Sequence, residues 1–196
     1  MQSMIGKTML AMTAWLLCSF SLWADGKVDI PEPGGKTLLH SGWLARKAGD
    51  VLQDGSELTL KPFHRDGWMQ ARVPGTVLTT LLDNKYYPAP EFGLNNNLIP
   101  DVSAVGNDFY TYWFVRPFEV GSIPAGRKVW LNFRGINYRA DIFLNGKRLN
   151  THTHEGMFLR ESYDMTPYLK SDGHNMLAVI VYPPTYPGNP NGGQGG

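Results

Sequence analysis

Two neighbouring segments of alternating residues most constrain the fold of this chain. Residues 129–133 and residues 138–144 each alternate between apolar and more polar side chains, and the second segment ends in Asn145-Gly146. Alternation with a period of two is typical of a strand that has one buried face. Asn-Gly is the dipeptide best suited to a two-residue hairpin turn, after which residues 147–149 supply a returning strand. The sequence therefore predicts a β-domain whose strand register is set here.

Composition excludes several classes of protein. The chain has 196 residues, of which 18% are charged, and a formal net charge of +1. A chain with so balanced a charge is no disordered polyelectrolyte, and it offers no basic surface to nucleic acid. Aromatic residues at 12%, with 22 glycines and 14 prolines, suit strands and turns better than a helical bundle.

The first 24 residues have the pattern of a secretory signal peptide. Lys7 precedes an apolar run that ends at the small residue Ala24, and such a run is too short for a lasting membrane span. A lipid attached at Cys18 is the less favoured alternative, because Leu16 and Leu17 replace the small residues that such a site needs. Cleavage after Ala24 removes the only cysteine, so no disulfide stabilises the mature domain. We expect a secreted or periplasmic protein.

The rest of the chain is predicted to form one β-domain between a leader and a tail. Residues 25–36 are expected to be a flexible leader, and residues 185–196 a linker towards a missing C-terminal part. Residues 37–184 are predicted to fold as an all-β, jelly-roll-type β-sandwich with a short helix and long loops. Further strands are expected over 37–43, 57–60, 68–73, 109–120, 157–159, 163–165 and 175–182.

Helical structure is expected at two places. Thr76 is predicted to cap a helix over residues 77–84, and Thr166 with Pro167 to begin a single helical turn. Residues 85–107 have no usable periodicity, and a loop of this length in a domain is usually either functional or disordered. The aromatic residues and prolines of this segment argue against disorder. The predicted core between two sheets comprises Val129, Leu131, Phe133, Ile142, Leu144, Leu177, Val179 and Val181.

The order of the motifs resembles that of a known family. The motifs are Val73-Pro-Gly-Thr76, an aromatic strand from Phe109 to Trp113, a hairpin over 131–145, His154-Glu-Gly-Met-Phe158, Asp164-Met-Thr166 and the strand 175–181. Together they resemble the N-terminal sugar-binding domain of family 2 glycoside hydrolases, closest to the β-mannosidase and exo-β-glucosaminidase branch. The resemblance extends over residues 38–184 and implies a galactose-binding-domain-like sandwich, cut from a longer protein.

The resemblance also implies where the chemistry lies. In such enzymes an immunoglobulin-like domain and a (β/α)₈ barrel follow, and the barrel carries the two glutamates of a retaining double displacement. We therefore expect the non-catalytic domain of an exo-acting enzyme that hydrolyses β-linked O-glycosides in carbohydrate metabolism. Its partner is expected to be a β-linked glycan, and no cofactor is expected. Two alternatives stay open, a free-standing carbohydrate-binding module and a structural β-sandwich without an enzymatic role.

The long segment before the aromatic strand carries the groups that sugar recognition needs. Sugars are held by aromatic rings and by planar polar groups that bind neighbouring hydroxyls, and Tyr86, Tyr87 and Phe92 lie beside a run of asparagines. The resemblance places an asparagine that precedes this strand at the active site, and Asn107 stands in that position. The structural alternative is that the asparagines cap turns. The predicted substrate-binding residues are Asn107, Asn95, Asp108 and Asn96.

Other reactive groups are assigned structural roles. The acidic residues share no motif, so none is predicted to be catalytic. His152 and His154 alternate on an extended segment, but no third ligand lies near in sequence, so packing is favoured over metal binding. Trp68 and Trp113 are expected in the core rather than as sugar platforms. Trp130 is expected on the strand face opposite the core, against a second sheet or at a domain interface.

Overall fold

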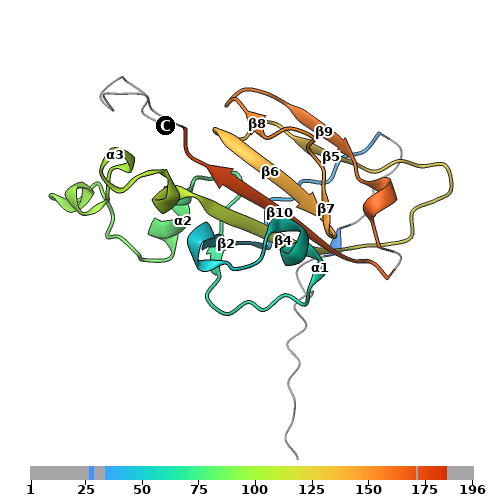
Figure 1. The fold of residues 1–196 in the computed structure, drawn as a ribbon, viewed down its shortest axis with the longest axis horizontal. Helices are drawn as coiled ribbons and strands as arrows, with labels where there is room; N and C mark the ends of the chain where they lie inside the picture. Colours follow the sequence, from blue (N-terminus) through green and yellow to red (C-terminus); the bar gives the residue numbers. More distant parts are fainter. Residues whose placement is uncertain (1–26, 29–33, 171, 185–196) are drawn as a thin grey trace, which may run out of the picture.

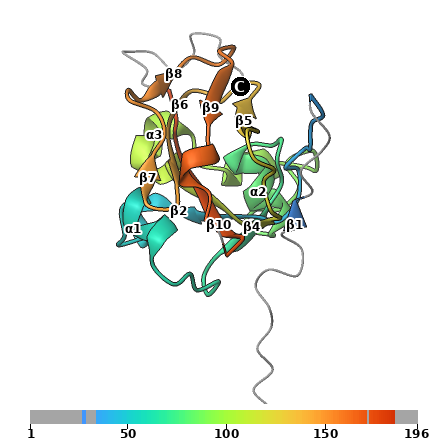
Figure 2. The same ribbon diagram turned by 90° about the vertical axis from the view of Figure 1, so that its right-hand side faces the viewer.

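Two sheets make up the domain in the computed structural model, which describes residues 27–28, 34–170 and 172–184. The large sheet has the strand order β3-β2-β4-β10-β6-β7, with β1 paired to β4 and β8 paired to β6. The strands β5 and β9 form a separate antiparallel sheet. Figures 1 and 2 show this small sheet lying over the large one. The predicted all-β sandwich is confirmed.

Among the described residues, β4 and β10 are the longest strands, and the helical elements are short. The strands are β1 (Lys27–Val28), β2 (Trp43–Lys47), β3 (Met69–Ala71), β4 (Tyr112–Val120), β5 (Trp130–Phe133), β6 (Arg139–Leu144), β7 (Lys147–Arg148), β8 (His154–Glu155), β9 (Glu161–Asp164) and β10 (His174–Tyr182). The helical elements are η1 (Ala48–Asp50), α1 (Gly55–Leu60), α2 (Val77–Asp83), η2 (Asn95–Leu98), α3 (Val102–Val105), η3 (Asn107–Tyr110) and η4 (Thr166–Tyr168).

The Asn-Gly turn between β6 and β7 has the predicted conformation. Asn145 and Gly146 have φ values of 49° and 86°, and positive φ at both central residues is the mark of a type I′ turn. The Asn145 side chain donates to the Tyr168 carbonyl at 2.8 Å and accepts from the Met176 amide at 2.9 Å. The Gly146 amide donates to Thr59 Oγ1 at 2.8 Å. The turn is therefore tied to η4, β10 and α1.

The predicted hairpin over residues 131–145 is wrong in one respect. Its two alternating segments are strands with the predicted buried faces, but they belong to different sheets. Leu131 of β5 pairs with Tyr163 of β9, whereas Ile142 of β6 pairs with Val179 of β10. Alternation reports which face of a strand is buried and does not identify the strand beside it. The chain crosses from one sheet to the other between β5 and β6.

The core between the sheets contains the predicted residues. Leu131, Ile142, Leu144, Leu177 and Val179 are buried in one cluster. The other three predicted members are half-buried at its margin, namely Val129, Phe133 and Val181. A second cluster lies on the outer face of the large sheet and includes Leu44, Leu58, Trp113 and Val115. The large sheet is therefore covered on both faces.

Helix α1 occupies residues for which a strand was predicted. The Asp54 side chain accepts a hydrogen bond from the Glu57 amide at 2.8 Å, so it acts as the N-cap. Leu58 is buried on the large sheet while Leu60 is exposed, as expected on a helix rather than on one face of a strand. A Cβ at Gly55 would lie 2.3 Å from the Phe143 ring, so the helix approaches β6 closely.

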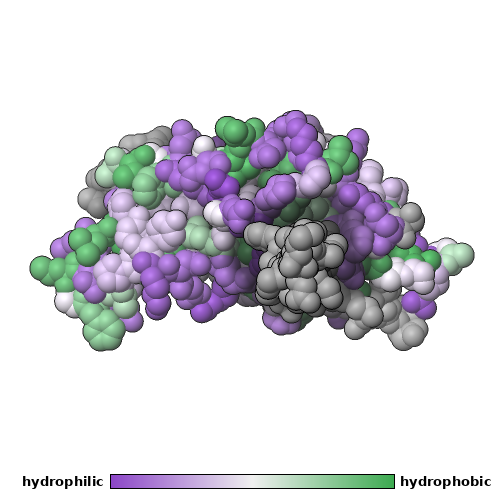
Figure 3. All heavy atoms as spheres, turned by 90° about the horizontal axis from the view of Figure 1, so that it is seen from below, coloured by the Kyte–Doolittle hydropathy of each residue, from purple (hydrophilic) through white to green (hydrophobic). Residues whose placement is uncertain are grey.

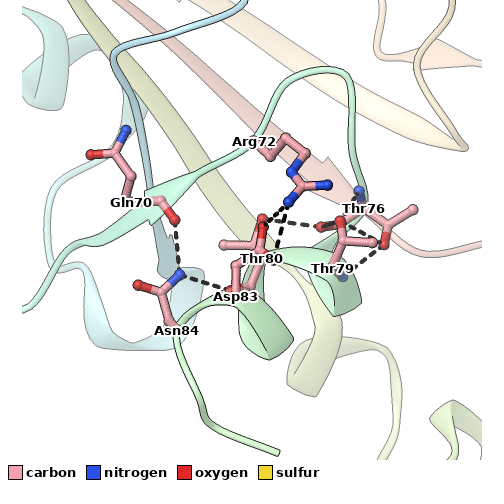
Figure 4. A network of polar contacts seen from close by, with 7 residues as sticks. All are labelled: Gln70, Arg72, Thr76, Thr79, Thr80, Asp83 and Asn84. Carbon is pink, nitrogen blue, oxygen red and sulfur yellow. Dashed lines mark hydrogen bonds and ion pairs between the residues drawn. The ribbon is translucent and has the colours of Figure 1, made fainter. Parts of the chain in front are cut away.

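Helix α2 forms where it was predicted and closes one side of the core. Thr76 and Thr79 make a reciprocal capping box at its start, and Leu81 is buried among the core residues. Figure 4 shows how polar contacts fasten the helix to β3, with Arg72 at 3.0 Å from Asp83. The Asn84 side chain, just after the helix, donates to the Gln70 carbonyl at 2.8 Å.

Several predicted strand limits need correction. The strand expected over 37–43 begins only at Trp43, and the one expected from residue 109 begins at Tyr112, because η3 comes first. Residues 157–159 form no strand. The strand in this part of the chain is β8, which ends at Glu155 and pairs with β6. These segments carry apolar side chains, but sheet pairing depends on partners that a local pattern does not reveal.

The second predicted helical turn exists with a different start. Thr166 lies inside η4 and makes no side-chain cap. Its hydroxyl instead accepts a hydrogen bond from the Val129 amide at 2.8 Å and so joins η4 to the segment before β5.

The predictions for the two ends of the chain lie mostly outside the described residues, which include neither residues 1–24 nor residues 185–196. Of the predicted leader, Lys27 and Val28 pair in parallel with Glu119 and Val120 of β4. Within the described part of the chain, no helix is long and apolar enough to cross a membrane.

Candidate functional site

The predicted site residues lie at one end of the sandwich. Tyr112, the first residue of β4, pairs with Val181 near the last residue of β10. The segment 85–111 therefore enters β4 at the same end of the sheet where β10 finishes. Figure 1 shows α3 and its flanking loops extending beyond this end. Phe92, Leu94 and Leu98 of this segment are exposed. The left end of Figure 3 shows hydrophobic atoms at the surface, mixed with hydrophilic ones.

Asn95 and Asn96 lie in η2, on the outer part of the segment. The Asn95 side chain donates to the Ala89 carbonyl at 3.0 Å, which is the turn-capping role typical of asparagine. The side chain of Asn96 is exposed, and its carbonyl accepts from the Ile99 amide at 3.2 Å. Asn96 thus keeps an available amide, while that of Asn95 is partly used within the loop.

Asn107 and Asp108 begin η3, directly before β4. Asn107 is half-buried, and its backbone carbonyl accepts from the Thr111 hydroxyl at 3.0 Å. Among the described residues, no hydrogen bond engages its side-chain amide, and Asp108 is exposed beside it. Within the described part of the chain, no hydrogen bond links this pair to Asn95 and Asn96. The four residues share one segment.

Some aromatic residues of the segment line a pocket. Phe92 and Tyr86 are both exposed, and Tyr86 together with Tyr87, Phe109 and Tyr112 lines a pocket of about 190 Å³. We call this the Tyr112 pocket, and Lys47 and Asp50 also line it. Sequence reasoning missed it, because Phe109 and Tyr112 have the pattern of strand residues and Lys47 and Asp50 are far away in the chain.

Tyr112 keeps its proton at the bottom of this pocket. Burial, followed by the neighbouring charges of Tyr87, Tyr86, Asp50 and Tyr110, raises the pKa of the Tyr112 phenol to about 12. The phenol is therefore neutral at physiological pH and able to donate a hydrogen bond. The Lys47 ammonium lies 4.4 Å from the centroid of the Phe109 ring, within the range of a cation–π contact.

The tryptophans are mostly structural. Trp43 and Trp113 are buried in the two clusters, and Trp68 packs against the second cluster with its ring centroid 5.2 Å from that of Phe63. Trp130 is 50% exposed, on the face of β5 opposite Leu131 as predicted. It lines a larger groove of about 1140 Å³ beside that strand.

Only one of the two histidines has a packing role, because His152 is exposed. His154 is buried, with Nδ1 at 3.0 Å from Glu161 Oε1 and Nε2 at 2.8 Å from the Gly156 carbonyl. His154 thereby joins β8 to β9. This is the packing role that the sequence favoured over metal binding. In the described ranges no group of three or more His, Cys, Asp or Glu is placed to hold a metal ion.

Comparison with known proteins decides the family. Residues 47–193 match the family model described as glycosyl hydrolase 2 galactose-binding domain-like. The chain belongs to this family. The family 2 resemblance and the galactose-binding-like sandwich are thus both confirmed.

The curated relatives are family 2 enzymes that are much longer than this chain. A mannosylglycoprotein endo-β-mannosidase of Lilium longiflorum is 47% identical over 167 residues, which are 83% of this chain and 17% of the relative. An exo-β-D-glucosaminidase of Streptomyces avermitilis is 26% identical over 164 residues, again 83% of this chain and 17% of the relative. The chain spans about a sixth of the length of these relatives.

Solved structures of family 2 enzymes contain the same domain. The exo-chitosanase of Amycolatopsis orientalis superposes with a TM-score of 0.62 at 25% identity, over 77% of this chain and 16% of the other. A β-D-mannosidase of Dictyoglomus thermophilum shares the fold with a TM-score of 0.56 at 24% identity. The matched region covers 74% of this chain and 15% of the mannosidase.

Proposed function

We propose that this chain is the non-catalytic, sugar-binding N-terminal domain of a longer exo-acting retaining β-glycosidase. The proposal rests above all on the family match over residues 47–193 in a chain that spans only 17% of its 47% identical relative. The catalytic glutamates then belong to a barrel domain later in the protein, with an immunoglobulin-like domain in between. The role of this domain is to support the barrel and to narrow its pocket around one terminal sugar.

We infer from the relatives that a β-mannoside is the favoured substrate. Enzymes named for β-mannosides appear both at 47% identity and, as β-mannosidase B of Aspergillus terreus, at 31% identity. Since the 47% identical relative carries the name of an endo-β-mannosidase, endo action is the second candidate. The two differ in whether the barrel pocket is closed beyond the mannose or open to a longer glycan.

Two substrates separate these candidates. The longer protein should be incubated with 4-nitrophenyl β-mannoside and with a mannosylglycopeptide in which the β-mannosyl residue is internal. Exo action predicts release of nitrophenol and no cleavage of the internal linkage. Endo action predicts the reverse. A protein that hydrolysed neither of these substrates, nor 4-nitrophenyl β-glucosaminide, would contradict the proposed class.

Asn107 is proposed to contact the terminal sugar in the longer enzyme. Its side chain is the one member of the predicted set that is half-buried directly before β4 and has no hydrogen bond within the described chain. Asn107→Ala should lower kcat/KM by about tenfold to a hundredfold, the effect of losing one or two transition-state hydrogen bonds. The melting temperature should change little.

The exposed Asn97 in η2 offers a matched control for this substitution. Asn97→Ala should leave both kcat/KM and the melting temperature near the wild-type values. If Asn107→Ala instead lowered stability and spared activity, Asn107 would be a structural cap and its proposed role would be withdrawn.

Residues 1–24 are proposed to direct secretion or export to the periplasm, on the strength of their apolar run and its small final residue. N-terminal sequencing of the exported protein should begin at Asp25. An N-terminus at Met1 in the mature protein would contradict this proposal.

A further inference from the structure

The Tyr112 pocket is built from parts that are far apart in the sequence. Lys47, at the end of β2, pairs with Tyr112, at the start of β4, and the Ala48 amide donates to the Thr111 carbonyl at 2.8 Å. Tyr86 and Tyr87 follow α2, whose Leu81 forms part of the apolar wall. These contacts attach the Lys47 and Tyr112 side of the pocket to the large sheet.

The polar groups of the pocket suit a ligand with many hydroxyls. The Tyr112 residue is only 5% exposed, and no described residue is in hydrogen-bonding position to its hydroxyl. The exposed carboxylate of Asp50 accepts hydrogen bonds, and three phenols, on Tyr86, Tyr87 and Tyr112, both donate and accept. Among the described residues the Tyr112 oxygen is not one of the buried atoms left without a partner, so water reaches it, and a ligand hydroxyl can take the place of that water.

The charges of the pocket are of both signs. The Lys47 ammonium lies 4.4 Å from the centroid of the Phe109 ring and repels a second positive charge. Arg46 and Lys47 line the pocket together with the carboxylate of Asp50, so donors and acceptors stand side by side. A neutral, hydroxyl-rich molecule matches such a mixed lining, because each hydroxyl both donates and accepts.

The aromatic surface and the size of the pocket narrow this class further. Tyr86 is 65% exposed, so its ring offers a flat surface against which the C–H face of a sugar ring packs. The volume of about 190 Å³ suits one ring rather than an oligosaccharide. We propose that the Tyr112 pocket is a binding site for a single neutral pyranose residue, separate from residues 95–108 and independent of any catalytic domain.

Binding to the full 196-residue chain tests this site directly. The chain should be titrated with methyl β-D-mannopyranoside, followed by isothermal calorimetry or ligand-observed NMR. Saturable binding with a dissociation constant on the order of 1 mM is expected, because a small ligand makes few contacts. D-mannitol, which has similar hydroxyls but no ring to pack on Tyr86, should bind at least about tenfold more weakly.

Three substitutions assign the binding to this pocket. Tyr86→Ala removes the exposed ring and should weaken binding about tenfold. Tyr112→Phe removes one hydroxyl without changing the packing and should weaken it about threefold to tenfold, and Asp50→Asn should have a similar effect. Tyr168→Ala removes an exposed tyrosine of η4, beside the Asn145 turn at the other end of the sheet, and should leave the affinity unchanged.

Several results would overturn the assignment. They are the absence of saturable binding to the folded chain, equal affinity for mannitol, and wild-type affinity in Tyr86→Ala and Tyr112→Phe. Loss of binding in Asn107→Ala with these two variants unaffected would place the sugar on the η3 segment instead. Because the titration needs no turnover, its failure is distinguishable from a failure of the proposed enzyme class.

Discussion

Replacing Phe118 with alanine is expected to lower the free energy of unfolding by about 3–5 kcal/mol. Phe118 lies on the inner face of β4 and is 1% exposed, among the core residues between the two sheets. Removing its ring leaves a cavity that rigid strands on both sides cannot close. Since a domain of this size is stable by about 5–15 kcal/mol, this single change removes a large share of the total.

Thermal or urea unfolding followed by circular dichroism measures this effect. The melting temperature should fall by about 10 °C or more, from the usual relation between the two quantities for a domain of this size. Phe158→Ala is the matched control, because Phe158 is 87% exposed in the turn between β8 and β9. Equal effects of the two substitutions would mean that β4 does not form the centre of the core.

Asn175→Ala is expected to cost about 2–4 kcal/mol, because it leaves buried polar groups without partners. Asn175 is 0% exposed in β10. Its side chain accepts from Asn145 Nδ2 at 2.7 Å and from the Lys170 amide at 3.0 Å, and it donates to the Gly173 carbonyl at 2.8 Å. One side chain therefore holds together the β6–β7 turn, the segment after η4 and the start of β10.

The same unfolding measurement applies to Asn175→Ala. Asn97→Ala serves as the control, since it removes an exposed asparagine and should change the free energy of unfolding by less than about 0.5 kcal/mol. Asn175→Asp should also destabilise the domain, because it removes the donor to Gly173 and buries a charge. A stability of Asn175→Ala within error of the wild type would contradict the role assigned to this network.

The sequence predicted those parts of the fold that depend on local chemistry. The Asn-Gly turn, the Thr76 cap and the phase of β5, β6 and β10 follow from neighbouring residues and were found as expected. The partner of β5 was not predictable in this way. Its pairing with β9 joins residues about thirty positions apart, and alternation alone does not encode such a contact.

Helix α1 shows a different limit of the sequence pattern. Leu58 and Leu60 alternate as in a strand, but the Asp54 cap and the close approach that Gly55 allows to Phe143 favour a helix. The approach is a tertiary contact, so it was not visible in the local pattern.

The candidate site was predictable only in part. The segment bearing Asn95, Asn96, Asn107 and Asp108 was identified by its lack of periodicity, and their roles in binding stay predictions. The Tyr112 pocket was not foreseen, because it depends on the pairing of β2 with β4, which brings Lys47 beside Tyr112. Tyr86 and Tyr87 were noted as sugar-binding side chains without the partners that the fold places next to them.

One measurement tests the central proposal most directly: glycosidase activity of this chain beside that of the longer protein that contains it. Both are assayed with 4-nitrophenyl β-mannoside, β-glucosaminide and β-galactoside under identical conditions. The chain alone should release no nitrophenol above a buffer blank, while the longer protein should hydrolyse at least one substrate. Turnover by the chain alone would contradict its assignment as a non-catalytic domain of a family 2 glycoside hydrolase.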